Sequence, residues 1–310
     1  MSLISRIVQR VKRDFFRSRY HRTAGLVLAT RPLEKGTLPF TLLSMVHQRD
    51  VASYLVAVKS FAHFLNPAKI VVVCDPTIGA DERATLQRHV PHIELRHADE
   101  FTDPDIPRGG TWERLYAISQ YVKDSYVIQL DADTLTVREI PEVRAAIEAG
   151  HGFVLADMPN APIRSLQATR EKALPWLRDP SPHIQARAEV EMVNAGLPGD
   201  ARYIRGCSGF TGFPRSDAMQ AMMLDYSRRM QAKLGDGWKR WGTEQVTSNY
   251  VASNLPGTFP LPFPKYGTPD VATGETAFYH FIGSMRFVNG KYETTSRDAI
   301  RMISAAPEVT

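Results

Sequence analysis

Three short apolar runs in this 310-residue sequence each end directly at an aspartate, and this pattern constrains the fold more than any other feature. The runs are Ile70–Cys74, Tyr126–Leu130 and Phe153–Ala156. Strands of a parallel sheet that is covered on both faces have this nearly continuous apolar composition. Helical periodicity at residues 50–65, 81–89 and 112–122 alternates with these runs and with two further expected strands, at residues 39–46 and 92–95. The alternation predicts an α/β protein, a single Rossmann-like domain with a mostly parallel central sheet flanked by helices.

The composition limits the class of protein. Hydrophobic residues make up 43% of the chain and charged residues 23%, which is ordinary globular usage and excludes disordered or collagen-like chains. The two cysteines, Cys74 and Cys207, are too few for a disulfide framework. No apolar run approaches the roughly 18 residues that a membrane-spanning helix needs. We therefore expect a soluble, cytoplasmic protein with one core.

Positive charge is concentrated in the first 22 residues. They contain seven arginines and lysines and one aspartate, a net charge of +6, whereas the whole chain carries +5. The rest of the chain is thus nearly neutral, which argues against a general nucleic-acid-binding surface. The apolar residues of the segment recur at helical spacing: Ile4, Ile7, Val8, Val11 and Phe15.

Two interpretations of this amphipathic segment stay open. It could rest peripherally on the anionic inner face of a membrane, which is our expectation, or dock on its own domain. The segment does not resemble a signal peptide, because neither an apolar stretch nor a small-residue cleavage site follows its positive charges. We expect a basic helix at 1–22, a linker at 23–36, a domain at 37–295 and a tail at 296–310. Within the domain, residues 165–196 are expected to form a proline-interrupted helical insertion on the rim, and the proline-rich residues 255–276 a loop.

In an open α/β sheet the ligand site lies beyond the carboxyl ends of the strands. Of the two D-x-D triplets in the sequence, Asp103 to Asp105 lies among prolines, whereas Asp131 to Asp133 directly follows an expected strand. Residues i and i+2 of an extended segment face the same side, so Asp131 and Asp133 can hold a hard divalent cation together. A turn or a helix cap after the strand is the alternative explanation.

A third ligand candidate, His280, lies far along the chain. Gly283 and Arg286 follow it. The glycine would let a diphosphate approach the backbone, and the planar guanidinium of the arginine would bind the diphosphate charge. Two carboxylates and one imidazole suit Mn²⁺ better than an all-oxygen Mg²⁺ site. A hydrogen-bonded core histidine is the alternative. The glycine-rich dinucleotide and phosphate-loop motifs are absent, and Gly206–Gly209 misses the spacing of a hydrolase nucleophile turn.

The order of three short motifs resembles the retaining GT-A-fold glycosyltransferases, the family of glycogenin and the bacterial lipopolysaccharide galactosyl- and glucosyltransferases. The motifs are Tyr126–Thr134, Gly242-Thr243-Glu244-Gln245 with Asn249, and His280–Arg286. The likeness extends from about residue 40 to about residue 287. It implies a GT-A fold and a metal-dependent, hexosyltransferase-like enzyme that moves a sugar from a nucleotide-diphosphate sugar, with retention, to an envelope-polysaccharide, lipid-linked or other glycan acceptor.

The resemblance also implies roles for individual residues. The metal ligands would be Asp131, Asp133 and His280, with Mn²⁺ or Mg²⁺ as the ion. The donor, expected to be a UDP-sugar, would be bound by Val46, His47, Gln48, Arg114, Ala132, Gly283 and Arg286. At the reacting end, Gln245 would lie near the anomeric carbon, and Asp157 and Glu244 would hold sugar or acceptor hydroxyls.

Three positions depart from the family pattern. Arg286 stands where lysine is usual, which preserves the charge. Cys207 stands where an asparagine is common, and Gln48 stands near the position of a base-reading aspartate, which leaves the base open. Two other functions also remain: a nucleotidyltransferase, although its glycine-rich triphosphate loop is missing, and an inactive sugar-nucleotide-binding or scaffold protein.

Overall fold

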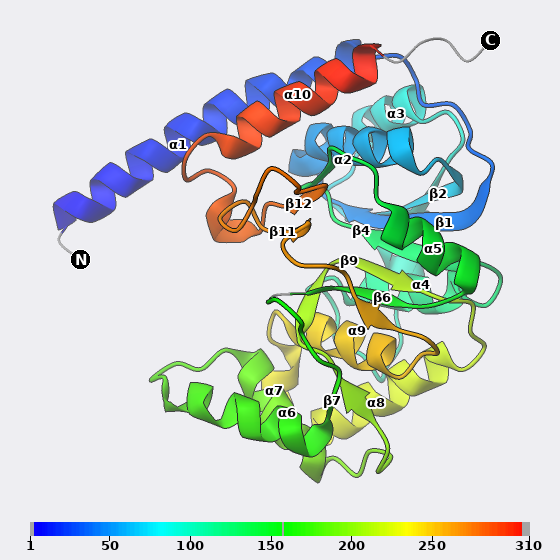
Figure 1. Ribbon diagram of the computed structural model, residues 1–310, viewed down its shortest axis with the longest axis vertical. Helices are drawn as coiled ribbons and strands as arrows, with labels where there is room; N and C mark the ends of the chain where they lie inside the picture. Colours follow the sequence, from blue (N-terminus) through cyan, green and yellow to red (C-terminus); the bar gives the residue numbers. More distant parts are fainter. Residues whose placement is uncertain (1–2, 157, 306–310) are drawn as a thin grey trace.

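The computed structural model of the chain describes residues 3–156 and 158–305, and its centre is a seven-stranded sheet (Figure 1). The strand order is β10-β6-β9-β4-β1-β2-β3. Neighbouring strands are parallel except where β9 pairs antiparallel with β4 and β6. The strands are β1 Leu38–Val46, β2 Pro67–Cys74, β3 Ile93–His97, β4 Tyr126–Leu130, β6 Phe153–Ala156, β9 Gly206–Phe213 and β10 Phe259–Pro260. The α/β architecture expected from the sequence is confirmed.

Helices cover both faces of this sheet, which explains the continuous apolar runs. Along β2, Ile70 and Val72 belong to one apolar layer, and Val71 and Val73 belong to the other. Successive side chains of a strand point to opposite faces, so a strand buried on both faces needs an apolar residue at every position. The first layer includes residues of α2 (Val51–Phe64), α3 (Ala80–His89) and α5 (Pro141–Ala149). The second includes residues of α4 (Trp112–Tyr121), α8 (Met219–Leu234) and α9 (Thr243–Ser253).

The central antiparallel strand β9 was not expected from the sequence. It carries three glycines, which weaken the strand signal. The structure gives two of them a packing reason. An ideal Cβ on Gly212 would lie 2.3 Å from the Phe153 ring, and one on Gly206 would lie 2.3 Å from Val154. The glycines therefore let β6 side chains lie directly against the strand.

A second, three-stranded sheet contains the strand that carries His280. It has the order β11-β12-β5, with β5 at Thr134–Thr136, β11 at Tyr266–Gly267 and β12 at Phe278–His280. The proline-rich segment expected to be a loop is mostly irregular and contains the two-residue strands β10 and β11. The antiparallel pairing of β12 with β5 sets His280 opposite Thr134, one residue after Asp133.

The segment at 165–196 contains two α-helices, and its prolines, Pro175, Pro180 and Pro182, lie between them. It contains α6 (Leu166–Ala173), a 3₁₀ turn at Leu174–Arg178 and α7 (Ile184–Glu191). A short antiparallel pair, β7 at Arg164–Ser165 and β8 at Arg202–Tyr203, joins its two ends.

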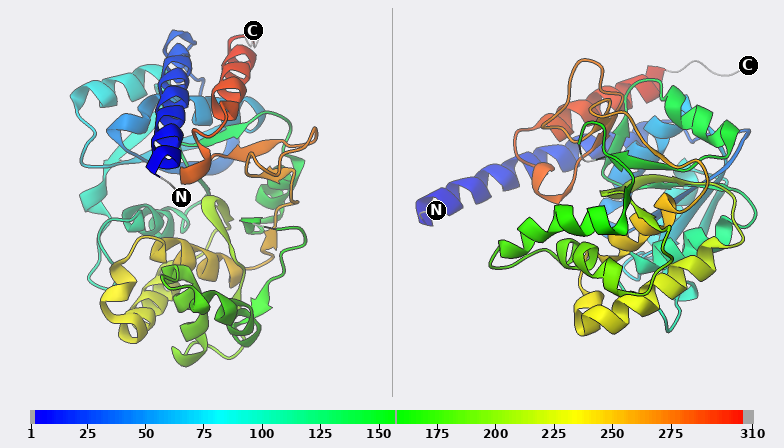
Figure 2. Two further views of the ribbon diagram at one scale, coloured as in Figure 1. Left: turned by 90° about the vertical axis from the view of Figure 1, so that its left-hand side faces the viewer. Right: turned by 60° about the horizontal axis from the view of Figure 1, so that its bottom comes forward.

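The two terminal helices, α1 (Leu3–Gly25) and α10 (Lys291–Ala305), lie side by side across the α2 face (Figures 1 and 2). The segment from residue 296 that we expected to be a tail is therefore helical as far as Ala305. A short 3₁₀ helix, Leu26–Ala29, occupies part of the expected linker. Among the described helices, none combines the length and apolar character needed to span a bilayer.

Helix α1 docks through a face other than the one predicted. Tyr20 and Ala24 in its second half are buried, and the Tyr20 ring stacks on Tyr292 of α10 at 3.9 Å between centroids. The first half extends beyond the body of the molecule (Figure 2). The apolar side chains expected to meet a partner there remain exposed: Ile7, Val8, Val11 and Phe15.

Candidate active site

Chain topology brings two carboxylates and an imidazole, side chains of the kind that ligate metals, together at the carboxyl edge of the sheet. The turn after β4 carries Asp131 and Asp133, and the Asp131 amide donates to the carbonyl of Gly209 in β9 at 2.9 Å. Strand β12 brings His280 beside this turn. One ligand atom from each of Asp131, Asp133 and His280 lies within 4.8 Å of the other two. Two carboxylates and one imidazole form a donor set that fits a divalent transition-metal ion such as Mn²⁺.

The two carboxylates differ in exposure. Asp133 is 4% exposed, and its oxygens accept from Arg286 Nε at 2.8 Å and lie 3.2 Å from His280 Nε2. Burial works to raise the pKa of the Asp133 carboxyl, but the charges of His280 and Arg286 outweigh burial and hold that pKa below its usual range. Asp131 keeps about a quarter of its side chain exposed. Of the two carboxylates, Asp131 is therefore the more accessible to solvent.

Strand β9 supports the His280 ring from behind. The Sγ of Cys207 lies 3.3 Å from His280 Nδ1, which leaves Nε2 on the side of the carboxylates. An ideal Cβ on Gly209 would lie 2.1 Å from Cε1 of His280, so the ring fits only against a glycine. The one sign of this contact in the sequence is a cysteine at a position where the resembled family commonly has asparagine.

Two more expected site residues form a buried ion pair with each other. Arg114 of α4 lies between Asp131 and Glu244, and its Nη2 donates to Glu244 Oε1 at 3.2 Å. Burial raises the pKa of the Glu244 carboxyl, although the Arg114 charge opposes the shift. Glu244 also accepts from the hydroxyls of Thr111 and Ser208. The pair therefore links α4, α9 and β9 behind the metal cluster.

These groups line one cavity of about 600 Å³. Of the residues expected at the site, it contains His47, Arg114, Asp131, Ala132, Asp133, Glu244, Gln245, His280, Gly283 and Arg286. Val46 and Gln48 do not line it. The Val46 side chain is fully buried in the core, and the Gln48 amide donates to Glu82 at 2.8 Å. Asp157 lies outside the described residues.

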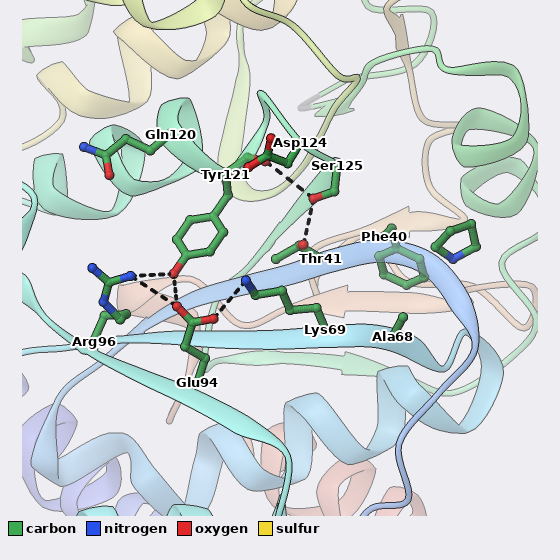
Figure 3. Close-up of a pocket in the computed structure, with 11 residues that line it drawn as sticks. Phe40, Thr41, Ala68, Lys69, Glu94, Arg96, Gln120, Tyr121, Asp124 and Ser125 are labelled. Carbon is green, nitrogen blue, oxygen red and sulfur yellow. Dashed lines mark hydrogen bonds and ion pairs between the residues drawn. The ribbon is translucent and has the colours of Figure 1, made fainter.

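A second cavity, of about 560 Å³, lies near the amino ends of β1 and β2 (Figure 3). Three of its charged side chains, Lys69, Glu94 and Arg96, are paired with one another. Glu94 accepts from Lys69 at 2.9 Å, from Arg96 at 3.2 Å and from the hydroxyl of Tyr121 (Figure 3). Ligands of open α/β sheets bind at the other edge, so this cavity is not the candidate site.

Comparison with known proteins shows similarity at the level of structure. No family model and no curated protein matches the sequence. Among solved structures, the apo form of the bifunctional glycosyltransferase WbbM is 14% identical over 89% of this chain, with a TM-score of 0.53. The chain spans about half of WbbM, 51% of its length. An active-site mutant of LgtC, a galactosyltransferase, is 13% identical, with 87% of this chain and 98% of that chain covered and a TM-score of 0.51. The protein therefore has the GT-A fold of these glycosyltransferases.

Proposed function

We propose that the protein is a metal-dependent glycosyltransferase that moves a sugar from a nucleotide-diphosphate sugar to a glycan or lipid-linked acceptor. One observation carries the proposal: Asp131, Asp133 and His280 converge inside a large cavity at the carboxyl edge of a GT-A sheet. The fold alone would fit other functions, because one fold hosts many chemistries. What favours sugar transfer from a nucleotide diphosphate is that two carboxylates and an imidazole converge at the carboxyl edge of the sheet, where the ligand is expected.

The residues around the cluster fit a diphosphate. A divalent ion held by Asp131, Asp133 and His280 would supply positive charge to the diphosphate as it leaves. Arg286 places a guanidinium at the same point, where a fixed cation stabilises developing negative charge. An ideal Cβ on Gly283 would meet no atom within 4 Å, so the backbone there is open to a ligand. We propose Mn²⁺ as the ion and a UDP-sugar as the donor.

In the proposed reaction the acceptor hydroxyl oxygen forms a bond to the anomeric carbon as the bond from that carbon to the diphosphate oxygen breaks. The hydroxyl proton passes to the leaving diphosphate. Gln245 is the side chain we assign to the sugar's reacting face, and its amide donates to Gln185 at 3.3 Å. An uncharged amide is a poor nucleophile, which favours attack of the acceptor from the leaving-group side, with retention, over a covalent intermediate.

The proposal is tested with a panel of nucleotide sugars and Mn²⁺. We expect one donor to raise the melting temperature and to release nucleoside diphosphate, and Asp131→Asn to abolish the release. Asp105→Asn, in the other D-x-D triplet and paired with exposed Arg228, is the matched control and should behave as wild type. Binding without any release would indicate a binding module, and turnover of nucleoside triphosphates would indicate a nucleotidyltransferase; either result contradicts the proposal.

We also propose that the first half of α1 binds an anionic membrane surface peripherally, which would bring the site to a lipid-linked acceptor. At about 100° per residue, Ile7, Val8, Val11 and Phe15 fall within an arc of ~100°. The docked residues Tyr20 and Ala24 fall outside that arc, so the stripe faces away from the body. By the same geometry, exposed Arg10 and Lys12 lie on either side of it, each within about 60° of its edge. An apolar stripe flanked by cations matches the acyl boundary and the anionic headgroups.

A further inference from the structure

The active-site cavity has a second group of lining residues that takes no part in the metal cluster. His183 and Gln185 come from the start of α7 in the rim insertion, Arg205 leads into β9, and Trp241 precedes α9. The insertion and the α9 loop are far apart in the sequence, yet they form one wall of the cavity.

Trp241 is unusual among the tryptophans of the chain. Trp112 and Trp238 are buried, and Trp176 lies under the guanidinium of Arg205 at 3.9 Å. Trp241 is 74% exposed, and its ring meets the His183 ring edge to face, with 5.9 Å between centroids and an interplanar angle of 84°. An indole that stays in water does not contribute the stabilising free energy that burial of this large apolar side chain usually gives. An exposed indole on a cavity wall is therefore a platform for a ligand with an apolar face.

The position of this indole is fixed by its neighbour. Gly242 has φ +103°, in the left-handed region that glycine tolerates, and an ideal Cβ there would lie 2.8 Å from Cε1 of His183. The following residue, Thr243, is fully buried and accepts a hydrogen bond from Trp112 Nε1 at 3.1 Å. The Thr243 hydroxyl also donates to the Arg240 carbonyl at 3.0 Å, so the backbone on the two sides of Trp241 is joined by a hydrogen bond.

Polar groups extend from this aromatic wall to the proposed reacting residue. Gln245 donates to Gln185 Oε1, and Gln185 donates to Glu189 Oε1, each at 3.3 Å. Glu189 is 1% exposed and accepts from Arg205 Nη1 at 2.9 Å. A buried carboxylate therefore holds Gln185 and Arg205 in place along the cavity wall. Together with the indole they offer one apolar face and a row of hydrogen-bonding groups.

We propose that this wall is the acceptor subsite and that it binds the pyranose ring of a neutral glycan. A pyranose has a C–H face that fits an indole and hydroxyls on its edge that fit amide and guanidinium groups. The subsite rests on the proposed glycosyltransferase function and adds to it the class of acceptor. It assigns Trp241 the role of stacking the acceptor, Arg205 that of binding its hydroxyls, and Gln185 that of positioning Gln245.

The test measures sugar transfer and donor hydrolysis in parallel. The probes are the methyl glycosides of glucose, galactose and N-acetylglucosamine, with the donor and Mn²⁺. We expect wild type to glycosylate at least one of them. Trp241→Ala should lower the ratio of transfer to hydrolysis at least tenfold through a raised acceptor KM, and Trp241→Phe should recover most of it. Leu174→Ala, an exposed apolar residue of the same insertion outside this cavity, should match wild type.

Three results have distinct meanings. An unchanged ratio in Trp241→Ala would overturn the stacking role. Donor hydrolysis by wild type without transfer to any of the three glycosides would overturn the neutral-pyranose subsite and leave the donor chemistry standing. Absence of nucleoside diphosphate release by wild type would overturn the proposed function, and the subsite with it.

Discussion

At the scale of single residues, the metal cluster depends on a glycine as much as on its ligands. Gly209 lies where a Cβ would come within 2.1 Å of the His280 ring, and its carbonyl accepts a hydrogen bond from the Asp131 amide at 2.9 Å, which ties this part of β9 to the turn after β4. Gly209→Ala should displace His280 and lower Mn²⁺ affinity by about 10- to 100-fold, the usual effect of disturbing a ligand's support. Mn²⁺ titration measures this. Gly199→Ala, where a Cβ meets no atom within 4 Å, is the control and should bind Mn²⁺ as wild type does.

A second residue, Lys59, should make stability depend on pH. It is buried in α2 and donates to Thr30 Oγ1 at 2.7 Å and to the Arg31 carbonyl, and burial lowers its pKa to about 8. The unfolded chain, with a lysine pKa near 10.4, therefore binds more protons than the native protein between about pH 8 and 10.4. The contribution of Lys59 to the free energy of unfolding should rise with pH across this window. Urea unfolding at several pH values measures it, and an equal pH slope in Lys59→Met would contradict the assignment.

At the scale of elements, the sequence predicts strands well where burial on both faces demands an apolar residue at every position. β4 and β6 have the expected bounds for this reason. β9 was not predicted because its glycines weaken the strand pattern. They are needed only where Phe153 and Val154 of the neighbouring strand pack against them, and this contact is not visible in the sequence. A similar reason explains why the docking face of α1 was not predicted. Tyr20 and Ala24 do not continue the apolar stripe of the first half, and their partners lie on α2 and α10.

The α1–α10 contact leads to a prediction at this scale. Glu293 of α10 is 3% exposed and accepts from Arg19 at 2.8 Å and from Arg297 at 2.5 Å. Glu293→Ala removes the shared acceptor, while both arginines, each 41% exposed, can return to water. We expect a loss of about 1.5–3 kcal/mol in the free energy of unfolding, the range for hydrogen bonds to charged groups. Chemical denaturation measures the loss, and Glu275→Ala, an exposed loop substitution, should cost little.

At the scale of the whole molecule, the sequence predicted the parts of the site that short motifs encode. Asp131, Asp133 and His280 were found because a carboxylate pair after a strand and a histidine followed by glycine and arginine can be read locally. No short motif predicts the ion pair of Arg114 with Glu244. The same is true of the contact between Cys207 and His280 and of the position of Trp241 beside His183. Each joins segments that only the fold brings together.

The arrangement of the whole molecule also bears on membrane binding. The projecting half of α1 and the α6–α7 insertion extend to the same side of the body in both figures (Figures 1 and 2). The insertion supplies His183 and Gln185 to the cavity wall. The projecting half of α1 thus lies on the same side of the body as the insertion that lines the proposed acceptor subsite.

Deleting residues 1–15 tests membrane binding by α1 because the docked second half of α1, with Tyr20 and Ala24, is kept. We expect the deletion to abolish sedimentation with anionic vesicles and to change the free energy of unfolding by less than about 1 kcal/mol, since the side chains of residues 7–15 are exposed. Each cation near an anionic surface contributes about 1 kcal/mol, so added salt should weaken binding of the full chain. Replacing Ile7, Val8, Val11 and Phe15 with glutamine keeps the charge and should also release the protein. Equal binding of full and shortened chains would contradict the membrane role of α1.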